Sequence, residues 1–370
     1  MSVSDIEESD SAIQRLTESP YGGFMTTKKT TTIAVYGASG ITGGHILGEL
    51  RRRGLAAILV GRDAARLRAA ADAAELTDAR ITVAALGDHD ALVAAFSGAD
   101  VVISALPAYV DNGEPVLAAA IDAGAHYTDV SGEQLFLKRV LDVYSARAEA
   151  AGVTVISGVT DNSLPADLLA YLTSRRVAGP ADIVISHLSK SGGNGSKGSA
   201  RTVLAGLDWF RSGGWHYADG ELRTGATTRH PEMTFPGDTA PTAVSKFPQP
   251  PVLTVPRHSE VSSVEGVVAT SILDQLGGFT AEIVDSLPET PSADLRYDLV
   301  VDAYGSDGAR VRGVVSGVDS YRDSALLTVE TAVRLARGEA KPGALAPAEA
   351  FDAARVLDSL EQFGITWRIE

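Results

Sequence analysis

Residues 33–43 read IAVYGASGITG and join a short apolar run to three glycines. The apolar run predicts a buried strand, and the spacing of Ile46, Leu47 and Leu50 predicts a helix directly after it. A strand that enters a helix through a glycine-rich turn is typical of the first βαβ unit of a dinucleotide-binding domain. The amides at the start of such a helix hold the phosphates of the dinucleotide.

Each glycine of this turn has an expected role. Gly37 permits the sharp exit from the strand, Gly40 lets backbone N–H groups approach a pyrophosphate, and Gly43 lets the helix pack closely on the sheet. The spacing is G-x-x-G-x-x-G rather than G-x-G-x-x-G, so by itself it also fits an ordinary strand-to-helix turn. The other predicted cofactor contacts of the turn are Ser39, Ile41 and Thr42.

The end of the second apolar run distinguishes the two nicotinamide cofactors. Residues 57–60 read AILV and are followed by Gly61 and Arg62. An NAD-binding unit usually has an acidic residue at this point, whereas an arginine suits the 2′-phosphate of NADP. We therefore predict NADP(H) as the cofactor, with Arg62 at the 2′-phosphate. The alternative is that Arg62 is only a solvated charge at the start of a helix.

The composition is typical of a soluble intracellular enzyme. With 370 residues and 45% hydrophobic content, the chain can bury a large core, and we expect two domains. A formal net charge of −15 argues against nucleic acid or an anionic membrane as a partner. The chain has no cysteine, which excludes thiolate metal sites, and no apolar run long enough to span a membrane. We expect a cytoplasmic protein without a metal site or a signal peptide.

The order of the predicted elements indicates an α/β fold with a Rossmann-type, doubly wound parallel sheet. Residues 1–30 are polar and predict a disordered tail, and residues 31–180 alternate between strand and helix patterns. The expected strands lie near 31–36, 57–60, 80–85, 100–104, 125–129 and 153–157. The expected helices between them lie near 63–75, 88–96, 113–123 and 134–151.

The pattern changes after Pro180 and predicts a second, mixed α/β domain over residues 181–318, which would hold the substrate. Residues 319–370 predict helices that return to the Rossmann domain. Residues 218–251 are rich in Thr, Gly and Pro and predict a long loop. The expected strands are 184–188, 252–255, 295–304 and 309–317, and the expected helices are 200–210, 321–337 and 347–362.

Polar side chains gather after the fourth, fifth and sixth predicted strands. Open α/β sheets bind ligands at the carboxyl ends of their strands, so these loops are expected to surround the nicotinamide. Tyr127 and Tyr109 are the predicted proton or hydrogen-bond donors, and Asp129 or Asp161 would tune them. The cofactor contacts expected from the loop after the fourth strand are Ser104, Ala105, Leu106 and Pro107.

Several polar residues also fit helix caps. Asn162 or Ser163 fits an N-cap with Pro165 in the first turn of its helix, and Ser131 fits a cap of the helix that carries Glu133. Asp167 in turn could serve only the helix dipole. Asn162 is nevertheless a candidate substrate contact, because it adds a polar group near the expected reaction centre.

Two cations near a glycine-rich segment are candidates for an anionic group of the substrate. Lys197 and Arg201 lie at the expected start of a helix, where backbone amides and side-chain charges attract anions. A solvated helix face explains these two residues equally well.

Five segments together resemble a known family. They are GASGITG at 37–43, VGR at 60–62, NGEPV at 112–116, HYTDVSGE at 126–133 and DNSLPAD at 161–167. Their order is similar to that of the saccharopine dehydrogenase-like NADP-dependent reductases, and most similar to the branch called trans-acting enoyl reductases. SGG at 191–193 and LAPA at 345–348 are similar to that branch too, so the resemblance covers most of residues 31–360. It implies a Rossmann domain, an inserted α/β substrate domain and hydride transfer from NADPH.

Two positions depart from that branch. This chain has Leu106-Pro107-Ala108-Tyr109 where the branch commonly has Gly-Pro and an aromatic residue, and Asn162 where a Phe is expected. Both changes fall near the expected nicotinamide pocket, so the substrate can differ from that of the branch.

We therefore expect an NADPH-dependent oxidoreductase that transfers hydride to a C=C (enoyl) or C=N (imine) bond of a small or carrier-bound metabolite. The sequence does not separate an enoyl reductase from an imine reductase, and a homodimer is an open expectation. The alternative from another class is a catalytically silent NADP-binding sensor. A sensor would keep Gly37, Gly40, Gly43 and Arg62 but would need no ordered substrate domain, and the long second half of the chain favours the enzyme.

Overall fold

Short apolar strands and alanine-rich helices alternate along the first half of the chain and build a parallel sheet. The computed structural model describes residues 30–190, 195–225, 227–276, 278, 280–287, 291 and 295–370. Within these residues the first sheet has seven strands in the spatial order β15-β6-β5-β4-β1-β2-β3, and all neighbouring pairs are parallel. The tail predicted at residues 1–30 lies outside the described residues, apart from Thr30.

The strands of the first sheet agree with the sequence pattern. All six strands predicted for it are confirmed, each within two residues of its expected bounds. They are β1 (Thr32–Tyr36), β2 (Ala56–Gly61), β3 (Arg80–Val83), β4 (Val101–Ser104), β5 (His126–Asp129) and β6 (Thr154–Ile156). The connecting helices are α1 (Ile41–Arg53), α2 (Ala64–Ala73), α3 (His89–Phe96), α4 (Tyr109–Asp122), α5 (Gln134–Arg139), the π-helical segment η1 (Val140–Tyr144) and α6 (Ser145–Ala151).

Helix α4 begins four residues before the predicted position 113. The main-chain N–H groups of Tyr109 and Val110 donate to the two carboxylate oxygens of Glu133, at 2.7 and 3.0 Å. These bonds satisfy amides that the start of a helix leaves without an intrahelical partner. Because the capping residue lies 24 positions further along the chain from Tyr109, the local sequence pattern does not reveal this start.

The second half of the chain forms a mixed sheet, as predicted. Among the described residues it has nine strands, and only the β12–β7 pair is parallel. The main path runs β10-β11-β12-β7-β13-β14-β16, with β8 paired to β12 and β9 paired to β8. The strands are β7 (Ala181–Ser189), β8 (Trp215–Ala218), β9 (Glu221–Thr224), β10 (Glu232–Met233), β11 (Thr242–Lys246), β12 (Val261–Ala269), β13 (Tyr297–Tyr304), β14 (Arg310–Gly317) and β16 (Thr366–Ile369).

Helices cover both sheets and form the connections of the second half. They are α7 (Leu164–Ser174), α8 (Lys197–Ala205), α9 (Leu207–Arg211), α10 (Pro251–Thr254), the 3₁₀ turn η2 (Val255–Arg257), α11 (Thr270–Leu276), α12 (Ala281–Ser286), α13 (Ser320–Ala336), α14 (Pro347–Ala350), α15 (Ala353–Leu360) and the 3₁₀ turn η3 (Glu361–Phe363).

Three details of the second half were predicted wrongly. The expected strand at 252–255 is helical, because Pro250 and Pro251 fix the backbone angle that a first helical turn needs. The expected loop at 218–251 contains β9, β10 and β11. Strand β12 was missed, because Ser262, Ser263 and Glu265 interrupt its apolar pattern. Tertiary pairing on both sides of β12 therefore outweighs its weak local signal.

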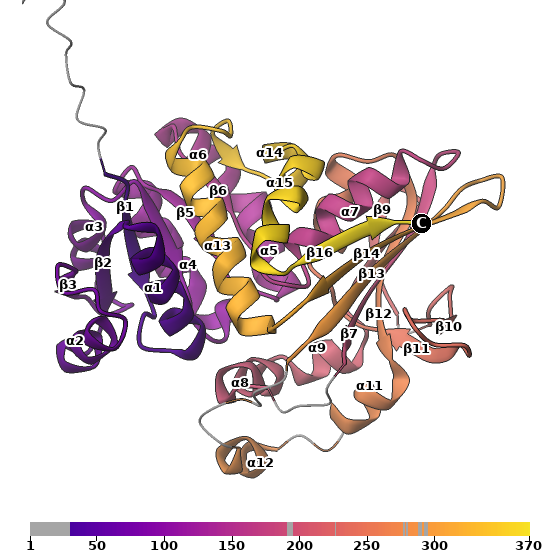
Figure 1. Cartoon of the computed structure of the whole chain (residues 1–370), viewed down its shortest axis with the longest axis horizontal. Coiled ribbons are helices and arrows are strands. Elements are labelled where there is room, and N and C mark those ends of the chain that lie inside the picture. The colour runs from indigo at the N-terminus through magenta and orange to yellow at the C-terminus, as the bar shows by residue number, and fades with distance from the viewer. Residues whose placement is uncertain are drawn as a thin grey trace, which may run out of the picture. The chain divides into compact units, whose positions relative to one another are not determined.

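The last fifty residues contribute to both sheets. Helix α13 lies against α1, β4 and β5 of the first half (Figure 1). Strand β15 (Gly343–Ala344) adds to the first sheet beside β6, and β16 pairs with β14 at the edge of the second. Neither of these two strands was expected from the helical pattern of residues 319–370.

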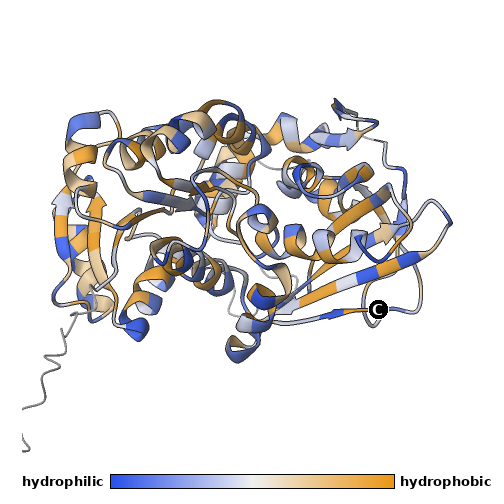
Figure 2. Cartoon of the chain, turned by 90° about the horizontal axis from the view of Figure 1, so that it is seen from above, coloured by the Kyte–Doolittle hydropathy of each residue, from blue (hydrophilic) through white to orange (hydrophobic). Residues whose placement is uncertain are grey.

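One apolar cluster connects the two sheets. It contains Ile33 and Val35 of β1, Ile183 of β7, Leu299 of β13 and Leu327 of α13, all buried. Figure 2 shows hydrophobic residues along the sheet strands and hydrophilic residues at turns and outer helix faces. The shared core holds β7 and α13 in fixed positions against the first sheet. None of the helices in the described ranges is long and apolar enough to cross a membrane.

A buried ion pair fixes helix α7 to its neighbours. Asp167 accepts a hydrogen bond from Nε2 of His258, at 3.0 Å, and its other oxygen accepts one from the main-chain N–H of Ala348, at 2.8 Å. The side chains of Asp167 and His258 are only 1% and 5% exposed. The interpretation of Asp167 as a residue that serves only the helix dipole is therefore wrong, because its carboxylate links α7, η2 and the start of α14.

Candidate functional site

A cavity of about 710 Å³ lies at the carboxyl ends of the parallel strands, where β1, β2, β4, β5 and β6 meet their following loops. Its wall includes the turn 37–42, the segment 60–63 and the loop 105–107 from the first half. Residues of β7, α8 and α13 complete the wall from the second half. Segments that are far apart in sequence therefore enclose one space.

The three glycines of the first turn differ in what surrounds them. Gly37 has φ of +91°, and a Cβ added there would lie 2.3 Å from the carbonyl oxygen of Ala105. A Cβ on Gly43 would lie 2.3 Å from the carbonyl oxygen of Gly37. Gly40 lines the cavity, and its added Cβ would have no neighbour closer than 3.5 Å. Gly37 and Gly43 thus allow main-chain segments to pack closely, whereas the absence of a side chain at Gly40 leaves room in the cavity.

The start of helix α1 suits a pyrophosphate. Gly40 is the N-cap residue, and no side chain caps the helix. The first-turn amides of a helix have no intrahelical partners and carry the positive end of its dipole. Ser39, Ile41 and Thr42 line the cavity beside Gly40, as predicted contacts should, while buried Gly43 does not. The turn is therefore an uncapped anion site that opens into the cavity.

Two arginines lie at one end of the cavity. Arg62 directly follows β2, Arg66 is on α2, and both are exposed and line the wall. The acidic residue between them, Asp63, accepts hydrogen bonds from the main-chain N–H groups of Ala65 and Arg66 at 2.9 and 3.1 Å. Asp63 is thus the cap of α2, and the two arginines give this end the charge that a 2′-phosphate requires. Arg66 was missed by sequence reasoning.

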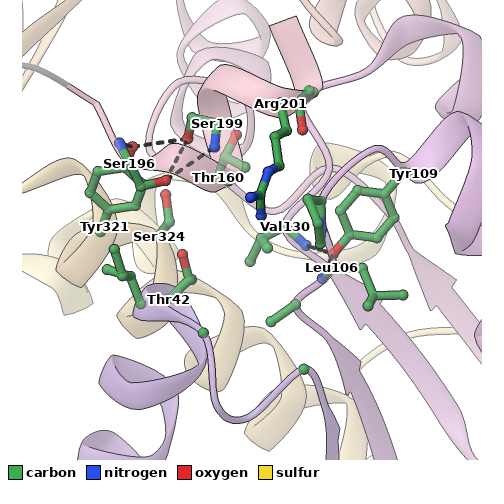
Figure 3. A pocket seen from close by; sticks show the side chains of 18 of the residues that line it. Thr42, Leu106, Tyr109, Val130, Thr160, Ser196, Ser199, Arg201, Tyr321 and Ser324 are labelled. Carbon is green, nitrogen blue, oxygen red and sulfur yellow. Dashed lines mark hydrogen bonds between the residues drawn. The ribbon is translucent and has the colours of Figure 1, made fainter. Parts of the chain in front are cut away.

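The loop after β4 lines the cavity with Ala105, Leu106 and Pro107, whereas Ser104 is fully buried behind it. Tyr109 also borders the cavity, but it is 1% exposed. Its hydroxyl accepts from the N–H of Leu106 at 3.1 Å (Figure 3). The same hydroxyl donates to the carbonyl oxygen of Ser104 at 2.7 Å. Burial raises the pKa of Tyr109, and nearby Asp129 adds to this rise. Tyr109 therefore supports the loop rather than offering a free proton.

The structure does not bring Tyr127 and Asp129 to the cavity. Tyr127 is fully buried on β5, and its hydroxyl has no hydrogen-bond partner among the described residues. Burial raises its pKa well above the usual value, and Asp129 adds to this effect. One oxygen of Asp129 accepts from the N–H groups of Ser131 and Gly158, both at 2.9 Å. Both side chains point into the protein, which argues against direct contact with a substrate.

Asp161 does line the cavity, and three side chains hold its carboxylate. Oδ2 contacts Nε2 of His187 at 3.0 Å and accepts from Ser320 at 2.6 Å, and Oδ1 accepts from Ser324 at 3.1 Å. Burial acts to raise the pKa of Asp161, but the charge and hydrogen bond of His187 and the two hydroxyls bring it below the usual value. An ionised carboxylate is therefore fixed behind a histidine in the cavity wall.

The three residues that also fit helix caps differ in the hydrogen bonds that their side chains make. Ser163 is the N-cap residue of α7, but its side chain makes no capping bond. Asn162 lines the cavity and uses its carbonyl oxygen to accept from the hydroxyls of Thr160 and Ser163, at 2.6 and 3.2 Å. The hydroxyl of Ser131 accepts from the N–H of Glu133 at 3.1 Å, just before α5. Asn162 thus remains a candidate substrate contact.

Helix α8 places Lys197 and Arg201 in the cavity wall. The hydroxyl of Ser196 caps this helix by accepting from the N–H of Ser199 at 3.1 Å. The hydroxyl of Tyr321 accepts from the N–H of Ser196 and forms a hydrogen bond with the hydroxyl of Ser199 (Figure 3). Figure 3 shows the side chain of Arg201 extending from α8 into the cavity. This position fits a cation that binds an anionic group of a ligand.

Among the cavity residues that the sequence did not predict are Arg66, His187, Ser320, Tyr321 and Ser324. For His187 a signal exists, because Ile183, Ile185 and His187 alternate along β7 and so share one face of the strand. Ser320 and Ser324 are four residues apart, which predicts one helix face. Nothing in the local sequence shows that this face meets Asp161.

Comparisons with known proteins agree with this geometry. Residues 33–156 match the family described as Saccharopine dehydrogenase NADP binding domain. A lipid droplet localized protein of Caenorhabditis elegans is 31% identical over 189 residues, which are 47% of this chain and 44% of that protein. A trans-acting enoyl reductase of Mycobacterium ulcerans is 30% identical over 152 residues, 40% of this chain and 36% of that protein. The chain thus matches less than half the length of these relatives.

A solved structure shares the fold over most of the chain. Saccharopine dehydrogenase (L-Glu forming) from Saccharomyces cerevisiae superimposes with a TM-score of 0.62 over 92% of this chain and 99% of that chain, at 14% sequence identity. At this identity the likeness shows the fold alone. The predicted cofactor is confirmed by the family that the first domain matches: residues 33–156 match the saccharopine dehydrogenase NADP-binding domain, and the cofactor is NADP(H).

Proposed function

We propose that this protein is an NADPH-dependent reductase that transfers hydride to a C=C or C=N bond of a small or carrier-bound metabolite. The observation that carries the proposal is the shared cavity. Its wall joins the glycine turn and Arg62 of the NADP-binding domain to His187 of the second sheet and Arg201 of α8. A protein that only sensed NADP would have no need for this second wall.

The residues of the cavity divide into those for the cofactor and those for the substrate. Gly40 and the first-turn amides of α1 would hold the pyrophosphate, and Arg62 with Arg66 would hold the 2′-phosphate. When bound, NADPH supplies a hydride. Arg201 and Asn162 would orient the substrate's polar groups, and such positioning accounts for a large part of the acceleration in a two-substrate reaction.

Apolar side chains form another part of the wall. Val203, Phe210, Phe247 and Pro248 line the cavity, and the rings of Phe210 and Phe247 pack with their centroids 5.3 Å apart. These side chains would exclude water from the reacting groups, which strengthens the electrostatic interactions there. An apolar wall beside Arg201 fits a substrate that has both an anionic group and an uncharged part.

The enoyl reaction is the preferred form of the proposal, since trans-acting enoyl reductases are among the relatives at 30–31% identity. The imine reaction is supported by the fold shared with a saccharopine dehydrogenase.

The direct test mixes purified protein and NADPH with a panel of 2-enoyl thioesters and a panel of cyclic imines while NADPH absorbance is followed. Oxidation with one panel selects the reaction, whereas oxidation with neither contradicts the proposal and favours a sensor. The cytoplasmic location and the homodimer stay predictions.

Replacing Arg62 with alanine is expected to weaken NADPH binding by about one to two orders of magnitude. The lost interaction is a charge-assisted hydrogen bond to the 2′-phosphate, worth about 1.5–3 kcal/mol. NADH lacks that phosphate, so its affinity should hardly change. Binding titrations of both cofactors at fixed ionic strength check this, with Arg68→Ala, an exposed arginine on the following helix α2, as the control. Equal losses for NADPH and NADH would show that Arg62 does not contact the phosphate.

A further inference from the structure

We propose that His187, held by Asp161, donates the proton that completes the reduction. The inference rests on the proposed function, because a hydride added to a C=C or C=N bond leaves an electron pair that must be protonated. Neither residue of this pair is part of the Rossmann turn. His187 comes from β7 of the second sheet, and Asp161 from the loop after β6 of the first.

The pair is built so that only one nitrogen of the imidazole is used by the protein. Nε2 of His187 contacts Oδ2 of Asp161 at 3.0 Å. Among the described residues Nδ1 has no hydrogen-bond partner, while the side chain lines the cavity and is 21% exposed. The ring packs against that of Tyr297, with centroids 5.0 Å apart. A ring fixed on one edge and one face leaves Nδ1 as the nitrogen that the protein itself does not use.

Hydrogen bonds hold the carboxylate of Asp161 in position and favour its ionised form. The hydroxyls of Ser320 and Ser324 donate to its two oxygens, and its main-chain N–H donates to Ser324 at 3.0 Å. Asp161 is 8% exposed. A buried, hydrogen-bonded carboxylate stabilises the imidazolium and fixes its orientation. The serines of α13 thus position the carboxylate, and the carboxylate positions the donor.

The other hydroxyls and carboxylates of the cavity are less suited to this role. The hydroxyl of Tyr109 donates to the main chain of its own loop, and both oxygens of Glu133 accept amides at the start of α4. The hydroxyl of Tyr321 remains a rival, although it already bonds the N–H of Ser196 and the hydroxyl of Ser199. A test must therefore compare His187 with Tyr321.

The proton and electron balance is complete with NADPH as the reductant. The substrate carbon gains a hydride, and the π electron pair of the C=C or C=N bond moves to the neighbouring atom or to the conjugated oxygen. The Nδ1–H bond of the imidazolium then breaks, and its proton bonds to that atom. The products are NADP⁺, the reduced substrate and a neutral imidazole, which regains a proton from water.

The test compares His187→Gln, Asp161→Asn, Tyr321→Phe and His89→Gln. His89 is a matched control, because its Nε2 contacts Asp122 at 2.9 Å on the protein surface. With the substrate that the panels identify, His187→Gln should lower kcat by about 100-fold or more, while the Kd for NADPH stays within about twofold. His89→Gln should keep wild-type kcat. In His187→Gly, added imidazole should restore turnover, which a purely structural role of His187 would not allow.

A second readout does not depend on turnover. Proton NMR should show a strongly downfield N–H resonance from the His187–Asp161 bond, present in His89→Gln and absent in His187→Gln and Asp161→Asn. Wild-type kcat in His187→Gln, or loss of kcat in Tyr321→Phe alone, would overturn the inference and leave the reductase intact. Absence of that resonance from the wild-type protein would also overturn it. Absence of NADPH oxidation with every substrate would instead overturn the proposed function and the inference with it.

Discussion

Gly40→Val is expected to remove NADPH binding and to leave the fold intact. The backbone of Gly40 has φ of −85° and ψ of 174°, which a β-branched residue adopts readily. Its added Cβ would meet no atom closer than 3.5 Å, so the side chain would extend into the empty space above the helix start. That space is where the pyrophosphate would lie, and we expect NADPH affinity to fall by at least about 100-fold.

Calorimetric titration with NADPH and a thermal unfolding curve check this prediction together. Gly48→Val is the control, because Gly48 is exposed on the same helix and has no neighbour within 4 Å of an added Cβ. The expected result is lost binding with a near-normal Tm for Gly40→Val, and normal binding for Gly48→Val. Wild-type affinity in Gly40→Val would mean that the dinucleotide does not bind at this turn.

Asp167→Ala is expected to destabilise the fold by about 3–5 kcal/mol, the usual cost of breaking a buried ion pair by removing one partner. The change leaves the buried imidazole of His258 without its carboxylate and the N–H of Ala348 without its acceptor. Urea unfolding measures the loss. Asp72→Ala, an exposed site on α2, should change the free energy of unfolding by less than about 0.5 kcal/mol. A similarly small change in Asp167→Ala would contradict the account of this pair.

The effect of Asp167→Ala should depend on pH. Burial acts to lower the pKa of His258, but the charge and hydrogen bond of Asp167 raise it above the usual value overall. The stability from the charged pair is therefore fully present below the unfolded-state pKa of about 6.5 and is lost as the pH rises through the folded-state pKa. The difference between wild type and variant should shrink over that rise. A difference that grows with pH would show that His258 is neutral in the native protein.

The fold of the first half is readable from the sequence, because its strands are short apolar runs between helices with clear spacing. The second sheet is harder to predict, since β12 has serines and a glutamate in its interior and is defined by its pairing with β7 and β11. The helix at 251–254 was also hard to predict, because two prolines and the tertiary context outweigh an apolar, strand-like run there.

The sequence predicted which residues line the cavity only where local chemistry determines their position. Gly40 lies in the turn after β1 and Arg62 directly follows β2, so their positions at the sheet edge can be inferred from the sequence. Tyr127 and Asp129 lie within β5 itself, so the strand and the helices packed on it enclose their side chains. The alternation along β7 places His187 on one face of its strand, but the local sequence does not show that this face meets a cavity at the edge of the other sheet.

The central claim is that cofactor and substrate meet in one cavity and exchange a hydride there. The most direct measurement uses NADPH deuterated at C4 of the nicotinamide, on the face that transfers, and determines the mass of the reduced substrate. We expect the product to carry one deuterium, in wild-type protein and in the slow turnover of His187→Gln, with none transferred by Gly40→Val. A reduced product without deuterium, or the absence of any reduced product from the wild-type protein, would contradict the account.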